Sequence, residues 1–376
     1  MLKETDIRKE LASRSKRIVI KLGTRILTGS DNLLEKPQIK QLVLQVCELV
    51  KRKIEVVLVS SGAVGAGMGV LQMKSRPGLL PKLQATAAIG QSQLMKVYDS
   101  FFRLKEIISA QILLTAEDLN NRARYLNVRN TLSTLLRYRV IPIINENDSV
   151  SVDEIKFGDN DTLASLVTTL VDADLLIILS DINGLYVDRD APNKIVSMVE
   201  SIGPRIEKLA MGSAPALGVG GMKTKLQAAK TVTTSGIPMI IANGRSRDVL
   251  LRIFNGDRIG TLFLAVKDKM VARKRWIAYS AISRGEIKVD NGAREALVQR
   301  GKSLLASGIV EVRGDFKTGD IVKILNEQGR EFARGVVNYS REELSKIKGL
   351  KTSQIESRLG YKFYDEAVHR DNLVIL

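Results

Sequence analysis

The sequence of 376 residues contains one cysteine, Cys47, and one histidine, His369. A single cysteine cannot form an internal disulfide bond, which is typical of proteins in a reducing cytosol. A zinc site built from cysteine and histidine is not expected, and a Ser-His-Asp or Cys-His catalytic unit is equally hard to build. An enzyme with this composition must use lysines, carboxylates, amides and backbone N–H groups, which suits phosphoryl transfer.

Long apolar stretches are also missing. No apolar run is long enough to span a bilayer, and the N-terminal segment "MLKETDIRKELASRSKR" has no apolar core of the kind found in signal peptides. We therefore expect a cytoplasmic protein that does not enter a membrane. The content of 44% hydrophobic and 26% charged residues is ordinary for a globular protein, and the length indicates two or three domains.

Acidic residues are too few to balance the basic ones, and the formal net charge is +17. An excess of this size fits a polyanionic partner or an anionic small substrate. A lysine-rich surface in solvent explains it equally well and is the simpler interpretation. Charge alone does not separate the two.

Strand-like and helix-like segments alternate over the first two thirds of the chain. Continuous apolar runs begin at residues 17, 55, 109, 140, 174, 237 and 260, and helical spacing of apolar residues occurs at 36–53, 127–139, 161–173 and 221–236. Strands that are apolar on both faces indicate a mainly parallel open sheet sandwiched by helices, an α/β fold. Polar and glycine residues follow the strand ends, where such sheets bind ligands.

The alternation of strands and helices ends near residue 270, where the basic segment "VARKRWIAYS" connects to the next part of the chain. Short strand-like segments then follow, separated by glycines and interrupted by one helix, "NGAREALVQRG". This spacing predicts a small β-barrel or sandwich as a second domain.

Lysine, serine and glycine residues follow the first two expected strands. Lys21 lies near the end of "RIVIKLG" and precedes Gly23. A lysine there can reach phosphate oxygens and a glycine lets backbone approach a ligand, although a lysine in solvent explains the pattern too. Ser60 and Ser61 open "SSGAVGAGMG". Its glycines fit either an anion at a helix N-terminus or tight packing of helix against strand.

Amides and carboxylates follow the next strands. "NENDSV" (145–150) can hold an ammonium group and bind an amino acid, or it can be a plain turn. In "FGDND", Asp159 or Asn160 could cap a helix that starts near Asp161, but capping does not explain all three polar residues. Ser180 and Asp181 in "LSDING" fit a nucleotide site or an ordinary turn.

The segment "GVGGMKTK" (218–225) resembles a phosphate-binding loop of the form G-x-x-x-x-G-K-[ST], except that Met222 replaces the second glycine. Either the small residues coincide by chance, or they form a phosphate cradle of another design. Lys223 and Lys225 lie two positions apart and point to different sides of a helix. Geometry alone does not say which of them enters a site.

Taken in order, "KLGT", "SSGAVGAG", "NENDSV", "FGDND", "LSDINGLY" and "GVGGMKTK" resemble the amino acid kinase family, and within it the members that phosphorylate glutamate. The resemblance runs from about residue 16 to about residue 265. The tail from about 280 to about 364 is similar to a PUA domain, a small β-fold first known from RNA-modifying enzymes. The implied domains are a kinase domain over 1–270 and a PUA-like domain over 280–364.

The resemblance implies roles for the lysines and for one carboxylate. Lys21 is implied to contact the transferring phosphoryl group. Lys225 is favoured over Lys223, which falls at a variable position of the family. Asp161 is implied to hold the two functional lysines in place.

It also implies the binding residues. Ser61, Asp148 and Asn160 resemble residues that bind glutamate, and Ser180 and Asp181 fall where the family binds nucleotide. The implied ATP-binding segment consists of Val219, Gly220, Gly221, Met222, Lys223, Thr224 and Lys225, together with Lys21.

The implied reaction converts ATP and L-glutamate into L-glutamyl 5-phosphate and ADP, the first step of proline synthesis. Mg²⁺ is expected to be bound by the ATP phosphates, without an identified protein ligand. The resemblance further implies a homo-oligomer and feedback inhibition by L-proline. Two alternatives remain: a family member acting on carbamate, aspartate, acetylglutamate or UMP, and an RNA-binding or RNA-modifying protein that uses the PUA-like tail.

Overall fold

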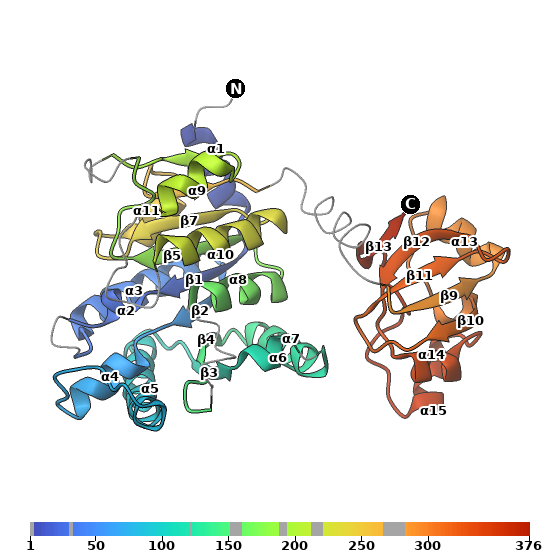
Figure 1. Ribbon diagram of the computed structural model, residues 1–376, viewed down its shortest axis with the longest axis horizontal. Helices are drawn as coiled ribbons and strands as arrows, with labels where there is room; N and C mark the ends of the chain where they lie inside the picture. The colour runs from blue at the N-terminus through green and yellow to red at the C-terminus, as the bar shows by residue number, and fades with distance from the viewer. Residues whose placement is uncertain are drawn as a thin grey trace. The chain divides into compact units, whose positions relative to one another are not determined.

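The computed structural model describes residues 4–29, 33–120, 122–150, 160–187, 194–211, 221–265 and 283–376 (Figure 1). The contacts divide the chain into two compact units, residues 1–267 and 268–376. The sequence expectation places the kinase domain over 1–270. In the described part, no helix is both long and apolar enough to cross a bilayer.

The first unit is built on an eight-stranded sheet with the strand order β3-β4-β2-β1-β5-β7-β8-β6. All neighbouring strands are parallel except the pair β7 and β8. The expectation of a mainly parallel sheet is therefore confirmed. The strands are β1 (Arg17–Leu22), β2 (Glu55–Ser60), β3 (Ser109–Leu114), β4 (Ile141–Glu146), β5 (Leu175–Ser180), β6 (Met198–Val199), β7 (Met239–Asn243) and β8 (Thr261–Phe263).

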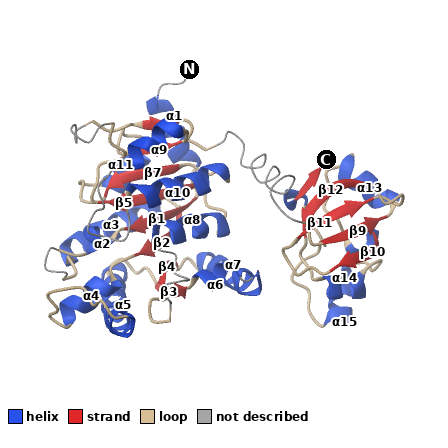
Figure 2. Cartoon of the chain, in the orientation of Figure 1, coloured by secondary structure: helices blue, strands red, loops and turns tan. Residues whose placement is uncertain are grey.

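Helices cover both faces of this sheet, as Figure 2 shows. The first unit contains α1 (Glu4–Arg14), α2 (Thr24–Leu27), α3 (Lys36–Lys51), α4 (Ala63–Val70), α5 (Leu80–Arg103), α6 (Ala116–Asn120), α7 (Arg122–Arg137), α8 (Asn160–Leu170), α9 (Pro204–Met211), α10 (Met222–Thr234) and α11 (Val249–Phe254). Helices α3, α5 and α11 share one apolar core with the sheet. Helices α7, α8, α9 and α10 share the other.

Strand β1 illustrates how the two cores are separated. Ile18, Ile20 and Leu22 belong to the core with α3 and α5, whereas Val19 belongs to the core with α8 and α10. Successive side chains of a strand point to opposite faces of the sheet. An apolar residue at every position is what a strand covered on both faces requires.

The glycine-rich segment after β2 is itself helical and forms α4. A Cβ atom at Gly67 would lie 1.9 Å from the carbonyl oxygen of Thr86, and one at Gly90 would lie 1.8 Å from that of Ala63. Any side chain at these positions would separate α4 from α5. Close packing of the two helices therefore explains Gly67 and Gly90.

The second unit contains a five-stranded, mostly antiparallel sheet in the order β10-β9-β11-β12-β13. The strands are β9 (Gly285–Val289), β10 (Ile309–Gly314), β11 (Ile321–Leu325), β12 (Glu331–Val336) and β13 (Leu373–Ile375), and the helices are α13 (Asn291–Val298), α14 (Arg341–Ile347) and α15 (Ile355–Leu359). The small β-rich tail is thus confirmed. Strand β13 lies beyond residue 364, the end of the PUA-like segment expected from the sequence.

Candidate active site

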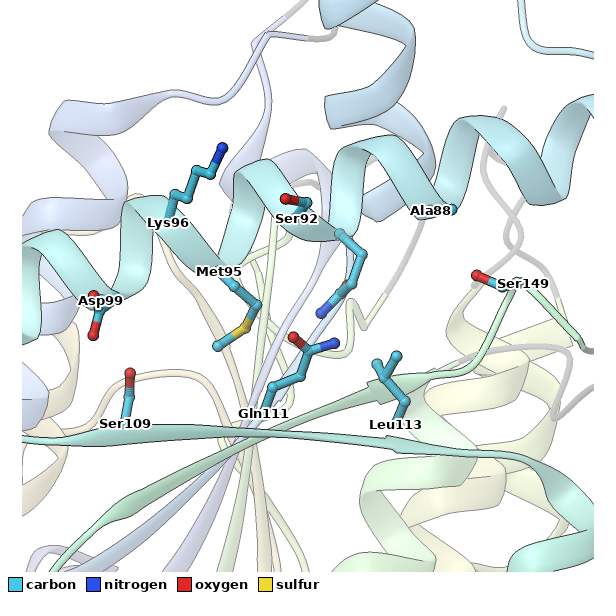
Figure 3. A pocket seen from close by; sticks show the side chains of 10 residues that line it. Ala88, Ser92, Met95, Lys96, Asp99, Ser109, Gln111, Leu113 and Ser149 are labelled. Carbon is cyan, nitrogen blue, oxygen red and sulfur yellow. The ribbon is translucent and has the colours of Figure 1, made fainter.

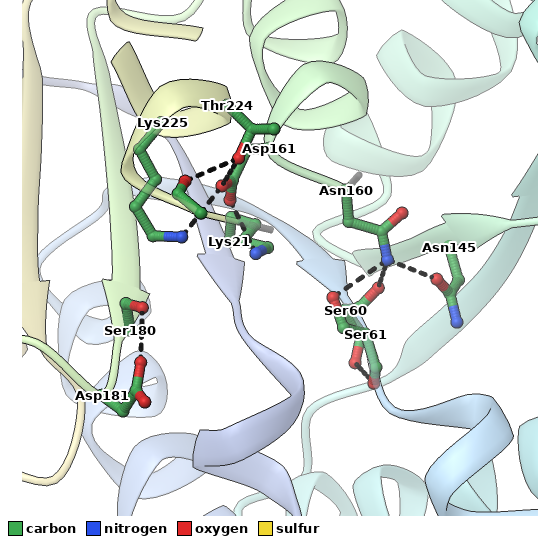
Figure 4. A network of polar contacts seen from close by, with 11 residues as sticks. Lys21, Ser60, Ser61, Asn145, Asn160, Asp161, Ser180, Asp181, Thr224 and Lys225 are labelled. Atoms are coloured by element: carbon green, nitrogen blue, oxygen red, sulfur yellow. Dashed lines mark hydrogen bonds and ion pairs between the residues drawn. The ribbon is translucent and has the colours of Figure 1, made fainter. Parts of the chain in front are cut away.

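Polar side chains gather at the carboxyl ends of four adjacent parallel strands. The order β4-β2-β1-β5 places Asn145, Ser60, Lys21 and Ser180 along one edge of the sheet. In an open α/β sheet this edge is where ligands bind. Figure 4 shows that the side chains form three groups, centred on Asp161, on Asn160 and on Asp181.

The first group is a buried cluster of two lysines and one carboxylate. Lys21 Nζ lies 2.6 Å from Asp161 Oδ1, and Lys225 Nζ lies 3.1 Å from Asp161 Oδ2. Both lysines are 4% exposed and Asp161 is fully buried. Lys21 points to the same face of the sheet as Val19, the face covered by α8 and α10. The helices on that face carry Asp161 and Lys225, so the three side chains meet.

The start of α10 distinguishes the two lysines of "GMKTK". Lys225 is buried against Asp161, whereas Lys223 is exposed to solvent. Thr224 Oγ1 lies 3.2 Å from Asp161 Oδ2 and 2.8 Å from the carbonyl oxygen of Gly221. Gly221, the residue before α10, makes no side-chain cap, and the N-terminal end of a helix favours an anion. Gly218, Val219 and Gly220 lie outside the described residues.

The second group is a set of amides and hydroxyls around Asn160. Asn160 Nδ2 lies 2.7 Å from the carbonyl oxygen of Ser60, 3.0 Å from Ser61 Oγ and 2.9 Å from Asn145 Oδ1. An amide nitrogen carries two hydrogens, so these three acceptors fully use its donors. Asn160 and Asp161 are consecutive at the start of α8, and this one turn of helix supplies both groups.

The opposite atom of the Asn160 amide has a different environment. Asn160 Oδ1 is buried and has no hydrogen-bond partner among the described residues. A buried acceptor of this kind is costly unless something donates to it. Asp148 follows in the turn after β4 and is half-buried. Asp159 lies outside the described residues.

The third group lies at the end of β5. Ser180 Oγ lies 3.1 Å from Asp181 Oδ1, and Arg25 Nη1 donates to Asp181 Oδ2 at 2.8 Å. Burial works to raise the pKa of Asp181, but hydrogen bonds from Arg25, from its own backbone and from Ser180 outweigh burial and lower it. Asp181 is therefore ionised at neutral pH and held by Arg25.

Sequence patterns do not point to three residues of this region, Arg25, Gln91 and Tyr98. Gln91 and Tyr98 lie on α5, and α5 is absent from the expected helices. Its signal is present in the sequence, because apolar residues recur at helical spacing over residues 80–103. Two large polar residues on that apolar, buried face are the feature that could have been noticed.

Metal-ligating side chains do not gather in the described part of the chain, where no group of three or more His, Cys, Asp or Glu residues could hold an ion. Cys47 is buried and belongs to the apolar core. Burial raises the pKa of its thiol, so Cys47 is a packing residue rather than a nucleophile.

Comparisons with known proteins agree with this geometry. The family model for the amino acid kinase family matches residues 16–243, and that for the PUA domain matches residues 285–359. A glutamate 5-kinase from Thermoanaerobacter sp. (strain X514) is 52% identical over 364 residues, covering 96% of this chain and 98% of its own. A glutamate 5-kinase from Syntrophotalea carbinolica is 50% identical over 372 residues, covering 98% of this chain and 100% of its own.

A solved structure extends the comparison to the fold. Carbamate kinase from Giardia lamblia bound to AMP-PNP aligns with a TM-score of 0.50 and 20% identity, covering 68% of this chain and 100% of that chain. At this identity the likeness shows the fold alone. The match in sequence over nearly the whole length is far more specific, and it places the chain in the amino acid kinase family as a member of the glutamate 5-kinases with a C-terminal PUA domain.

Proposed function

We propose that this chain transfers the γ-phosphoryl group of ATP to the side-chain carboxylate of L-glutamate, giving L-glutamyl 5-phosphate and ADP, the first step of proline biosynthesis. The observation that carries the proposal is the buried Lys21–Asp161–Lys225 cluster directly beside the Asn160 amide cluster. One group suits the phosphates and the other suits an amino acid. Relatives about half identical over nearly the full length are glutamate 5-kinases.

The lysine cluster addresses the main obstacle of this reaction, the approach of two anions. The γ-carboxylate of glutamate has a pKa of about 4.3 and is already a nucleophile at neutral pH, so no general base is needed. Lys21 and Lys225 offset the repulsion and the charge that develops on the transferring phosphoryl group. Asp161 contacts both ammonium groups and keeps them at fixed positions.

The nucleotide is assigned to the edge next to this cluster. Ser180 and Asp181 end β5, the strand adjacent to β1. The segment 219–225 ends in the uncapped first turn of α10, whose N–H groups favour phosphate. Mg²⁺, when bound, would neutralise phosphate charge.

The amino acid is assigned to Ser61, Asp148 and Asn160. Asn160 Oδ1, the buried acceptor without a partner among the described residues, suits a hydrogen bond from an ammonium group. Asp148 adds a carboxylate that attracts the same group. Ser61 Oγ is within reach of the Asn160 amide and completes the pocket at the end of β2.

The test is ATP turnover with a panel of acceptors, in which hydroxylamine traps any acyl phosphate. Glutamate should give the hydroxamate with ATP, whereas aspartate, acetylglutamate and carbamate should give little product. Turnover that prefers another acceptor would keep the fold assignment and reject the substrate.

L-Proline is proposed as a feedback inhibitor that competes with glutamate. It keeps an α-carboxylate and a cationic nitrogen, the groups that the residues of 145–160 are assigned to bind. High glutamate should relieve the inhibition, and inhibition that glutamate cannot relieve would require a separate site. A cytoplasmic homo-oligomer is proposed from the family resemblance. Light scattering of the purified chain would test the assembly.

A further inference from the structure

Helix α5 carries two buried polar side chains on the face that it turns toward the sheet. Gln91 is 8% exposed and Tyr98 is fully buried. They lie seven positions apart, which places both on the same face of the helix, two turns from each other. Tyr98 Oη lies 3.0 Å from Ser60 Oγ at the end of β2, and Gln91 contacts Asn145 in β4.

The strands present suitable partners on that face. Asn145 shares its face of β4 with Ile141 and Ile143, and both isoleucines belong to the core that contains α5. Gln91 Oε1 accepts a hydrogen bond from Asn145 Nδ2 at 2.8 Å. Both side chains are at least nine-tenths buried.

Asn145 connects Gln91 to the amide of Asn160, which lies on the other side of the sheet. Its Oδ1 accepts from the backbone N–H of Glu146 at 2.9 Å and from Asn160 Nδ2 at 2.9 Å. The two ends of the Asn145 amide therefore have fixed and different tasks. Its Nδ2 donates to Gln91, and its Oδ1 accepts from Asn160 and from the backbone of Glu146.

The orientation of Asn145 in turn affects Asn160, which is assigned to bind the amino acid. Asn160 can present its Oδ1 to a ligand only while its Nδ2 is bound to Asn145, Ser60 and Ser61. A different orientation of Asn145 would remove one of these acceptors and loosen the amide. Gln91 has no atom among the assigned substrate contacts, so its influence runs through Asn145.

We propose that Gln91 is a positioning residue for glutamate, which orients the Asn160 amide by way of Asn145. This inference rests on the proposed function, because it names what holds the glutamate pocket in shape. It assigns Gln91 an effect on glutamate affinity and none on the nucleotide, since the lysine cluster contains no member of this amide chain.

A cavity beside Gln91 makes a clean substitution possible. Its volume is about 540 Å³, and its lining includes Gln91, Ser92, Gln111 and Ser149. Figure 3 shows Gln111 on β3 pointing toward α5 across this space, with Ser92 on α5 and Ser149 at its far end. A methionine at position 91 has similar length and room to adjust. Gln91→Met therefore removes the hydrogen bond with little overpacking.

The experiment compares Gln91→Met, Gln91→Glu and Gln93→Met with the unmodified chain. Gln93 lies on the same helix, is half-buried, and takes no part in the amide chain. Gln91→Met should raise the KM for glutamate about tenfold, with the KM for ATP and kcat within about twofold. Gln91→Glu keeps an acceptor at the same position and should stay within about threefold. Gln93→Met should match the unmodified chain.

Two results would overturn the inference. One is an unchanged KM for glutamate in Gln91→Met. The other is an equal loss in kcat and in both KM values, which would mean that Gln91 only supports the fold. Absence of glutamate phosphorylation in the unmodified chain would instead reject the proposed function. A further check is the pair Gln91→Met and Asn145→Ala, whose effects on the KM for glutamate should be less than additive because they act on one chain of contacts.

Discussion

Lys225 Nζ lies 3.1 Å from Asp161 Oδ2 in the interior of the first unit, whereas Lys223, two residues earlier in the same helix, is exposed to solvent. The two lysines have the same chemistry and nearly the same place in the sequence. Their environments differ because residues two apart on an α-helix point to different sides. This pair therefore provides a matched test of the site.

Lys225→Ala should lower turnover by about 10²-fold or more, because it removes a positioned positive charge from the transition state. Lys223→Ala should stay within about twofold of the unmodified chain. Acyl phosphate formation is the measurement, and circular dichroism checks that both variants are folded. A folded, active Lys225→Ala together with an inactive Lys223→Ala would assign the functional role to Lys223 instead.

Asp161→Asn should reduce both activity and stability, since two buried ammonium groups would lose the carboxylate that they share. Removing one partner of a buried ion pair costs about 3–5 kcal/mol. Urea unfolding measures the loss, and triphosphate should raise the melting temperature of the variant more than that of the unmodified chain.

Asp257→Asn is the control, because its ion pair with Arg252 is on the surface and should contribute at most about 1 kcal/mol. Equal stability of Asp161→Asn and Asp257→Asn would show that the lysine cluster does not need its carboxylate.

Asp148→Asn should raise the KM for glutamate strongly and leave that for ATP nearly unchanged. The residue is half-buried in the turn after β4, three positions after Asn145 of the amide cluster, and β4 does not pair with β5. Steady-state kinetics with each substrate varied in turn gives both values. A parallel rise in both would place Asp148 outside the glutamate pocket.

Arg8→Met should destabilise the first unit without changing its chemistry. Arg8 is 2% exposed, pairs with Glu4 at 2.9 Å, and donates to the backbone carbonyl groups of Ile259, Ser197 and Gly260. Hydrogen bonds from a charged group contribute about 1.5–3 kcal/mol each at most, so we expect a loss on the order of 2–3 kcal/mol by urea unfolding.

Arg14→Met is the counterpart on the same helix, because the ion pair of Arg14 with Glu10 is exposed. Its effect should be below about 0.5 kcal/mol. If the two variants unfold at the same urea concentration, helix α1 is not fastened by Arg8.

A fragment of residues 1–267 should fold cooperatively and still form glutamyl phosphate. It contains the whole eight-stranded sheet and every residue assigned to the site, and it ends where the contacts divide the chain. Thermal melting and hydroxylamine trapping at saturating Mg²⁺ are the measurements. A cooperatively folded fragment without activity would mean that the second unit contributes to catalysis.

The sequence by itself determined the elements that repeat a simple pattern. Buried strands such as "RIVIKL" and "LLIILS" are apolar at every position because both faces of the sheet are covered. The lysines, amides and carboxylates after the strands were recognisable because each motif is local. Helix α5 was missed, and with it the tight packing of Gly67 and Gly90 and the contacts of Gln91 and Tyr98.

The residue patterns alone did not decide which of these local motifs meet; the family resemblance implied it, and the tertiary structure supplies the physical reason. The strand order β4-β2-β1-β5 differs from the order in the chain, and it brings Lys21, Asp161 and Lys225 together from positions far apart in the sequence. Residue spacing left open which of Lys223 and Lys225 is buried, because that depends on how α10 is rotated against the sheet; the resemblance favoured Lys225, and Lys225 is the buried one. A periodic pattern is encoded within a few residues, whereas strand order and helix rotation depend on packing across the whole unit.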